Sequence, residues 1–170
     1  MDLGERLVGL LGKAEDNSEF QAFLAEFRPY LKLRTRSNGK EYVFSQLGFS
    51  LYYDAGFRCL LILVFDICSR GVIEGKMQPF DGQLPFNISP SDTSIEIRGK
   101  VKGEPLRTGI ISLPNPDTYL DHEITSDSYK VPPYDLAVTF RVDLNRLETV
   151  MVMFSIETAL RDAMGSVLLE

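Results

Sequence analysis

The sequence predicts one α+β domain, in which hairpins build an antiparallel sheet and helices pack on one face of it. Three observations predict this class. The 170 residues fit a single domain. Near the start, apolar residues recur at helical spacing. Farther along, three pairs of alternating or apolar runs are separated by short turns, as in β-hairpins. The layout also leaves open two tandem α-β-β units, with halves at residues 1–80 and 81–155 and a C-terminal helix at 156–169.

Two helices are expected at the start of the chain. Asn17 or Ser18 is a suitable N-cap for the second of them, and Pro29 marks its end. The apolar positions share one helical side in each segment: Leu3, Leu7, Leu10 and Leu11 in the first, and Phe20, Phe23, Leu24 and Phe27 in the second.

Three hairpins are expected, at residues 31–45, 49–65 and 135–154. The first turns at Asn38-Gly39, a pair that favours the positive φ angles of a type I′ turn. In the second hairpin the returning strand is apolar on both faces, which predicts a central position in the sheet.

Between the second and third hairpins the pattern is less regular. Residues 71–90 hold many breakers and one short strand around residues 72–76. Phe80, Leu84 and Phe86 in this crossover either pin it to the core or form an exposed patch, and we expect pinning.

The next stretch begins with residues 91–102, which fit a helix capped by Ser91-Asp92, although their alternation also fits a strand. A strand is expected around residues 108–113, and a polar loop at 114–133.

Composition argues against several classes of partner. The formal net charge is −6, whereas nucleic acids and anionic membranes are bound mainly through Lys and Arg. The most apolar run, residues 59–65, is too short to span a membrane, and the start lacks the pattern of a signal peptide. We interpret Cys59 and Cys68 as reduced thiols, which favours a cytoplasmic location.

The residues needed for common catalytic and metal sites are scarce. His122 is the single histidine, and together with the two cysteines it makes three ligands of the kind that zinc prefers. Neither a phosphate-binding glycine loop nor a calcium-binding spacing of acids occurs. We therefore expect no catalytic residues, no metal and no cofactor, and a function other than catalysis.

Charge is concentrated in one stretch. Residues 104–129 hold five acids and one base, which is −4 of the total −6, together with aromatic side chains. Tyrosine supplies contact area at interfaces and acids attract a basic partner, so this stretch is the predicted binding surface. The predicted partner-binding residues are Asp117, Tyr119, Asp121, Glu123, Asp127, Tyr129 and Tyr134.

Three segments occur in order along the chain: LVGLLGKAEDNSEFQAFL, FDGQLPFNISPSDTSIEIRGKVKGEP and YDLAVTFRVDLNRLETVMVMF. Together they resemble small bacterial α+β proteins associated with toxin–immunity systems. The layout is similar to the tandem helix-plus-sheet fold of the β-lactamase inhibitor protein and of outer-membrane assembly lipoproteins. The resemblance implies a fold more than an activity, and it brings no catalytic residue to this chain.

The expected function is an immunity or inhibitor protein that binds a cognate bacterial toxin or enzyme and occludes its active site. A partner with a basic surface fits the acidity of the chain. The alternative is an adaptor or scaffold module, oligomeric through the last helix.

Overall fold

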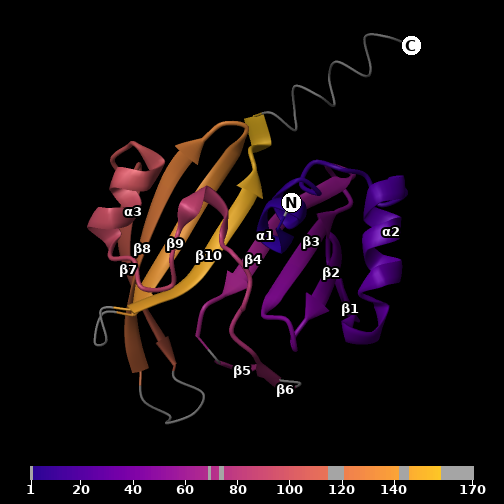
Figure 1. Cartoon of the computed structure of the whole chain (residues 1–170), viewed down its shortest axis with the longest axis horizontal. Coiled ribbons are helices and arrows are strands. Elements are labelled where there is room, and N and C mark those ends of the chain that lie inside the picture. The colour runs from indigo at the N-terminus through magenta and orange to yellow at the C-terminus, as the bar shows by residue number, and fades with distance from the viewer. Residues whose placement is uncertain (1, 69, 73–74, 115–120, 142–145, 158–170) are drawn as a thin grey trace.

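The computed structural model describes residues 2–68, 70–72, 75–114, 121–141 and 146–157 (Figure 1). For the strand residues among 70–76 and 110–124, only the backbone is described. The fold is α+β and rich in strands, with an eight-stranded antiparallel sheet at its centre.

The sheet has the order β1-β2-β3-β4-β10-β9-β8-β7. The chain therefore builds one half from its first four strands and the other from its last four, and β4 meets β10 in the middle. The eight strands are β1 (Lys32–Arg36), β2 (Gly39–Phe44), β3 (Phe49–Asp54), β4 (Cys59–Asp66), β7 (Arg107–Pro114), β8 (Asp121–Val131), β9 (Tyr134–Arg141) and β10 (Arg146–Phe154). The predicted central position of residues 58–65 is confirmed by β4.

The helix α2 (Ser18–Glu26) forms where it was predicted. The helix α1 (Leu3–Val8) is shorter than predicted, because Leu10 and Leu11 lie in the turns that follow it. Asn17 is the N-cap of α2, and its side chain accepts hydrogen bonds from the backbone N–H groups of Glu19 and Phe20. A short 3₁₀ turn at Arg28–Tyr30 contains Pro29 and leads into β1.

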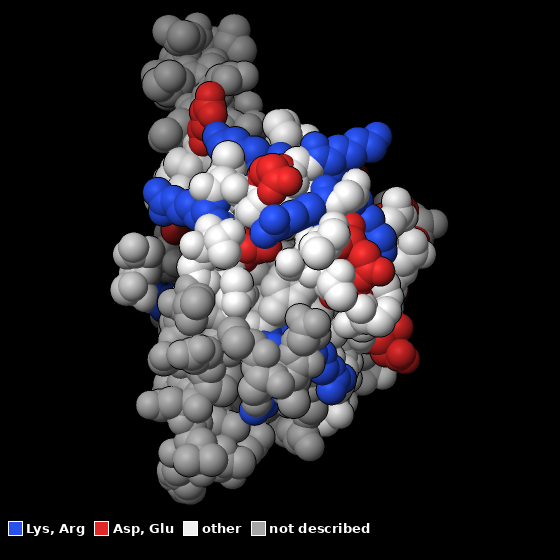
Figure 2. All heavy atoms as spheres, turned by 90° about the vertical axis from the view of Figure 1, so that its left-hand side faces the viewer, with Lys and Arg blue, Asp and Glu red and all other residues white. Residues whose placement is uncertain are grey.

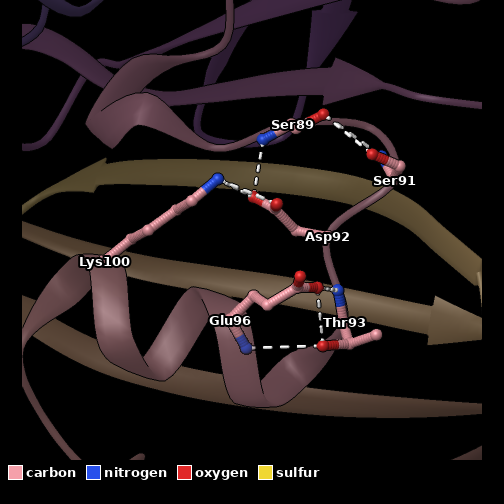
Figure 3. Close-up of polar contacts among 6 residues, drawn as sticks. All are labelled: Ser89, Ser91, Asp92, Thr93, Glu96 and Lys100. Atoms are coloured by element: carbon pink, nitrogen blue, oxygen red, sulfur yellow. Dashed lines mark hydrogen bonds and ion pairs between the residues drawn. The ribbon is translucent and has the colours of Figure 1, made fainter.

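The third helix, α3 (Ser94–Val101), settles the ambiguity at residues 91–102 in favour of a helix. The predicted cap at Ser91-Asp92 is wrong, because Thr93 is the N-cap and forms a capping box with Glu96 (Figure 3). Asp92 instead accepts hydrogen bonds from Lys100 Nζ at 2.6 Å and from the Ser89 backbone N–H at 2.7 Å. Both networks fix the start of the helix.

Two turns differ from the predictions. The first hairpin forms, but neither Asn38 nor Gly39 has a positive φ angle, so the type I′ turn is wrong. Gly39 is needed for another reason: a Cβ there would meet the Tyr53 carbonyl oxygen of the neighbouring strand. The single short strand expected at residues 72–76 is a small hairpin of β5 (Arg70–Val72) and β6 (Gly75–Met77).

One hydrophobic core joins the helices to the sheet. It includes Leu7 of α1, Phe20 and Phe23 of α2, and Ile97 of α3. Phe80 and Leu84 are buried in it and Phe86 packs against it at partial burial, which confirms that the crossover is pinned. The sheet contributes Tyr42, Phe44, Phe49, Leu51, Leu63, Phe65, Tyr129, Leu136, Val138, Val150 and Val152, among others.

The helix α2 is followed by the four strands β1 to β4, and α3 is followed by the four strands β7 to β10. An α-β-β unit would have two strands after each helix. In Figure 1 the first half runs from indigo to magenta and the second from orange to yellow. Both halves of the sheet thus have the same order of elements, a helix and then four strands.

Candidate functional site

The structure places four of the seven predicted partner-binding residues on β8 and a fifth, Tyr134, at the start of the neighbouring β9. Asp117 and Tyr119 lie outside the described residues. The loop expected at 114–133 is wrong for residues 121–131, which form β8 and pair with β7 and β9. Asp121 and Glu123 lie in this strand, opposite Pro114 and Ser112, and His122 lies opposite Leu113.

Asp127 and Tyr129 are brought together, but inside the protein. Asp127 is 1% exposed and Tyr129 is 2% exposed. The Asp127 carboxylate accepts a hydrogen bond from Thr108 Oγ1 at 2.9 Å and lies 3.7 Å from the Arg98 guanidinium of α3. Burial and the charge of Asp127 raise the pKa of Tyr129. The pair therefore anchors α3 on β8 and is not exposed to a partner.

Tyr134, the last predicted interface residue, is half-buried. Its ring packs on Phe154 with 6.3 Å between ring centroids. Figure 2, which views the side of the molecule that carries α3 and β7, shows basic and acidic side chains intermixed among the described residues. A continuous acidic surface on residues 104–129 is thus not visible in the described part of this side.

A different surface emerges from the register of the strands. Direct cross-strand partners point to the same face of a sheet. Ser50 pairs with Val64, Val64 with Met151, and Met151 with Ala137, so these side chains form one row. We call the face that carries this row the open face; its central residues are Tyr52, Ile62, Val64, Ala137, Thr139, Thr149, Met151 and Met153, all half-buried.

Two grooves mark the open face. One, of about 520 Å³, crosses the second half of the sheet and is lined by Leu106, Ala137, Met151, Met153 and Ile156, among others. The other, of about 230 Å³, lies over the first half beside Tyr52, Ile62 and Val64. Exposed apolar area of this kind on a sheet is typical of a binding surface.

The rim of the open face that is formed by β1 is basic. Lys32, Arg34 and Arg36 alternate along this edge strand and share one face. Glu41 on β2 forms an ion pair with Arg36 and lies 4.0 Å from Arg34. The three cations and the one carboxylate give this rim a net positive charge in an acidic protein. Charged side chains on an edge strand also discourage pairing with other chains.

A polar cleft of about 580 Å³ lies near the α1–α2 connection and is lined by residues that include Glu15, Asp16, Tyr53 and Arg58. Glu15 accepts hydrogen bonds from Lys40 Nζ and Tyr42 Oη, each at 2.5 Å. These bonds hold the pKa of Glu15 below its ordinary value. Since Tyr42 is buried, Glu15 provides the partner that its hydroxyl needs.

We expect Glu15→Gln to lower the free energy of unfolding by about 1–2 kcal/mol at pH 7, because a charge-assisted hydrogen bond is lost. A depressed carboxyl pKa stabilises the fold above the unfolded value, about 4.3, and this stabilisation disappears as pH falls through the folded value. Denaturation curves should therefore show a larger difference in stability between the two proteins at pH 7 than at pH 3. The control is Asp16→Asn, at an exposed neighbour without a hydrogen bond among the described residues. An equal gap at both pH values would contradict the assignment.

Among the described residues, no group of three or more His, Cys, Asp or Glu side chains is placed to hold a metal ion. Within the same residues, no helix is long and apolar enough to cross a membrane.

Comparisons of the chain with known protein families, with curated proteins and with solved structures find no match. The resemblance to immunity proteins therefore stays a prediction.

The open face was not among the predicted sites. Its signal is present in the sequence, because Val150 to Phe154 of β10 reads Val-Met-Val-Met-Phe and is apolar on both faces. Such a strand is expected to be buried on both sides. In the described structure only one side is buried, and the methionines of the other side remain half-exposed.

Proposed function

We propose that the protein is an immunity or inhibitor protein that binds a cognate toxin or enzyme and covers its active site, and that it binds through the open face. The proposal takes α1, α2 and α3 to cover the opposite face of the sheet, as the sequence predicts. The observation that carries it is the row of half-buried apolar side chains at the centre of the open face, flanked by the charged rim of β1.

Several properties of the open face suit a protein partner. Its centre offers Tyr52, Met151 and Met153, and aromatic residues and methionine are enriched at interfaces. The backbone beneath is held in the middle of an eight-stranded sheet, so the surface is rigid before binding. A rigid, apolar centre with a charged rim matches the general anatomy of interfaces.

The predicted basic surface of the partner would have to meet the acids of residues 104–129 rather than the β1 rim. Of these acids, Glu104 is exposed. The β1 rim would instead suit carboxylates on the partner. The two contacts respond in the same direction to added salt, because both are attractions between opposite charges.

The test is to capture the partner from the native source on the immobilised protein, purify it, and measure its enzymatic or toxic activity with increasing amounts of this protein. We expect Val64→Asp to weaken binding by about 30-fold or more, because the substitution buries a carboxylate at the centre of the interface (a loss above about 2 kcal/mol). Thermal unfolding of the variant verifies that it is folded.

The matched control is Leu33→Asp, which places the same charge at an exposed position of β1, on the face opposite to Val64. It should bind as the wild type does. A captured protein whose activity is unchanged by saturating amounts of this chain would contradict the inhibitor function. Equal binding by Val64→Asp and wild type would contradict the open face as the interface.

A further inference from the structure

The register of the sheet forms a row of side chains that crosses the open face from β1 to β8. This row begins at Arg34, passes through Tyr52, Ile62 and Met153 in the middle strands, and ends at Lys130. Because direct cross-strand partners point to the same face of a sheet, these side chains all lie on the open face. The row therefore has a cation at each end and an apolar middle.

A second row lies beside the first and has the same pattern. It runs from Lys32 on β1 to Arg107 on β7, with Val64 and Met151 in its middle. Three of the four terminal cations, Lys32, Arg107 and Lys130, are exposed. The cations of both rows thus lie on two opposite sides of the apolar centre, at the two ends of the sheet in Figure 1.

Carboxylates of the protein itself neutralise only part of this positive charge. In the first row, Glu41 and Asp135 are the cross-strand partners of the two terminal cations. The second row has no acid between its ends, so the two rows together hold four cations and two carboxylates. Lys130 also lies 3.5 Å from the Glu157 carboxylate, but both side chains are more than half exposed, and such pairs are weak. The surplus charge is available to carboxylates of a partner.

The distance between the two basic sides indicates the kind of molecule that fits. The rows cross six and seven strand spacings, which corresponds to about 29 and 34 Å. A patch of this width is comparable with one side of a standard protein interface, whereas a small molecule would reach only one of the basic sides. A nucleic acid carries its charges without interruption, so the phosphates over the apolar middle would be left without cations.

We propose that the partner presents a protein surface with an apolar centre and with carboxylates on two opposite sides of it, about 30 Å apart. This contact surface is acidic, which is the reverse of the basic surface that the net charge of the chain predicts. The inference rests on the proposed function only in taking the open face as the binding surface. It specifies the chemistry of the partner that this face recognises.

Two synthetic peptides test this chemistry directly. Each is a helix of about 20 residues, which spans about 30 Å, and the two have the same composition and net charge. The matching peptide carries glutamates at both ends and leucines and methionines along one side of its middle. In the rearranged peptide the glutamates are in the middle and the apolar residues are at the ends. We expect the wild-type protein to bind the matching peptide at least about tenfold more tightly, as measured by fluorescence anisotropy.

Charge reversal shows whether the peptide binds to the open face. Lys32→Glu together with Arg107→Glu should weaken binding of the matching peptide at least about tenfold, because carboxylates then face carboxylates. The control is Arg28→Glu together with Lys102→Glu, at two exposed cations outside the rows. The control should change the affinity by less than about twofold, because charges away from the contact are screened. Thermal unfolding verifies that both variants are folded.

Several results would overturn the proposal. They are equal affinity for the two peptides, no binding of the matching peptide at about 1 mM, and equal losses in the two charge-reversed variants. Tighter binding of a single-stranded oligonucleotide of about 20 nucleotides would overturn it in favour of a nucleic acid.

The peptide result and the inhibitor function can fail separately. A protein that prefers the matching peptide but inhibits no captured enzyme would support this inference and contradict only the inhibitor function. Inhibition of a captured enzyme together with equal affinity for the two peptides would contradict only this inference.

Discussion

Phe23→Ala is expected to lower the free energy of unfolding by about 3–5 kcal/mol, the range for removing a fully buried phenylalanine. Phe23 is completely buried, and its ring lies 5.8 Å from that of Phe44 and 6.3 Å from that of Phe49. Alanine is the strongest helix former, so the substitution leaves α2 intact and removes only the packing between the helix and the sheet.

The control for Phe23 is Phe27→Ala, one turn later on the same helical side. Phe27 is half-buried and its ring packs against that of Phe23 at a tilt, with 4.6 Å between centroids. Its removal should be less costly, because water can reach the space it leaves. Urea denaturation of the two variants measures the difference. A loss for Phe23→Ala no greater than that for Phe27→Ala would show that α2 is not docked as described.

The second large effect is expected at Gly48, in the turn between β2 and β3. Gly48 has a φ angle of +74°, and a Cβ there would meet the backbone of the crossover at Gln78, Pro79 and Phe80. Its carbonyl accepts a hydrogen bond from the Asp66 N–H, while the Asp66 carbonyl accepts one from Phe80 N–H. Neither side of this contact is a flexible side chain that could move away.

Gly48→Ala should therefore destabilise the protein by about 3 kcal/mol, from the left-handed backbone together with the overpacking. The matched control is Gly99→Ala, within α3, where a Cβ meets nothing within 4 Å. That substitution should stabilise the protein by about 0.5–1 kcal/mol, because alanine favours the helix. Thermal or urea unfolding distinguishes the two signs. A Gly48→Ala protein as stable as the wild type would mean that the crossover packs elsewhere.

Local patterns were sufficient to predict most elements of the fold. The spacing of Phe20 and Phe23 predicts α2, and the apolar residues of β4 predict its central place in the sheet. These signals are contained within one helix or one hairpin. The pairing of β4 with β10 is different, because it joins residues about 85 positions apart and no local pattern specifies it.

The strand β8 was missed because its composition is that of a loop. Its sequence from residue 124 reads Ile-Thr-Ser-Asp-Ser-Tyr-Lys-Val, where Ser and Asp are weak strand formers. The alternation is nevertheless present: Asp127 and Tyr129 point inward, and Ser128 pairs with Ala137 of the open face. Asp127 is tolerated inside because Thr108 and Arg98 lie beside its carboxylate, and neither is near it in sequence. The burial of Asp127 and Tyr129 was missed for the same reason, since charge alone does not reveal which side chains are buried.

The seam between β4 and β10 has a consequence for the kinetics of folding. Within each half of the sheet every strand pairs with a neighbour in the chain, so these contacts form after the closure of short loops. The seam instead requires closure of a long loop, whose entropic penalty is met before any of its five registered pairs contributes stability. We therefore expect the joining of the two halves to be the slow step in folding. Since β1 and β2 pair before that step, substitutions within them should mainly change the folding rate.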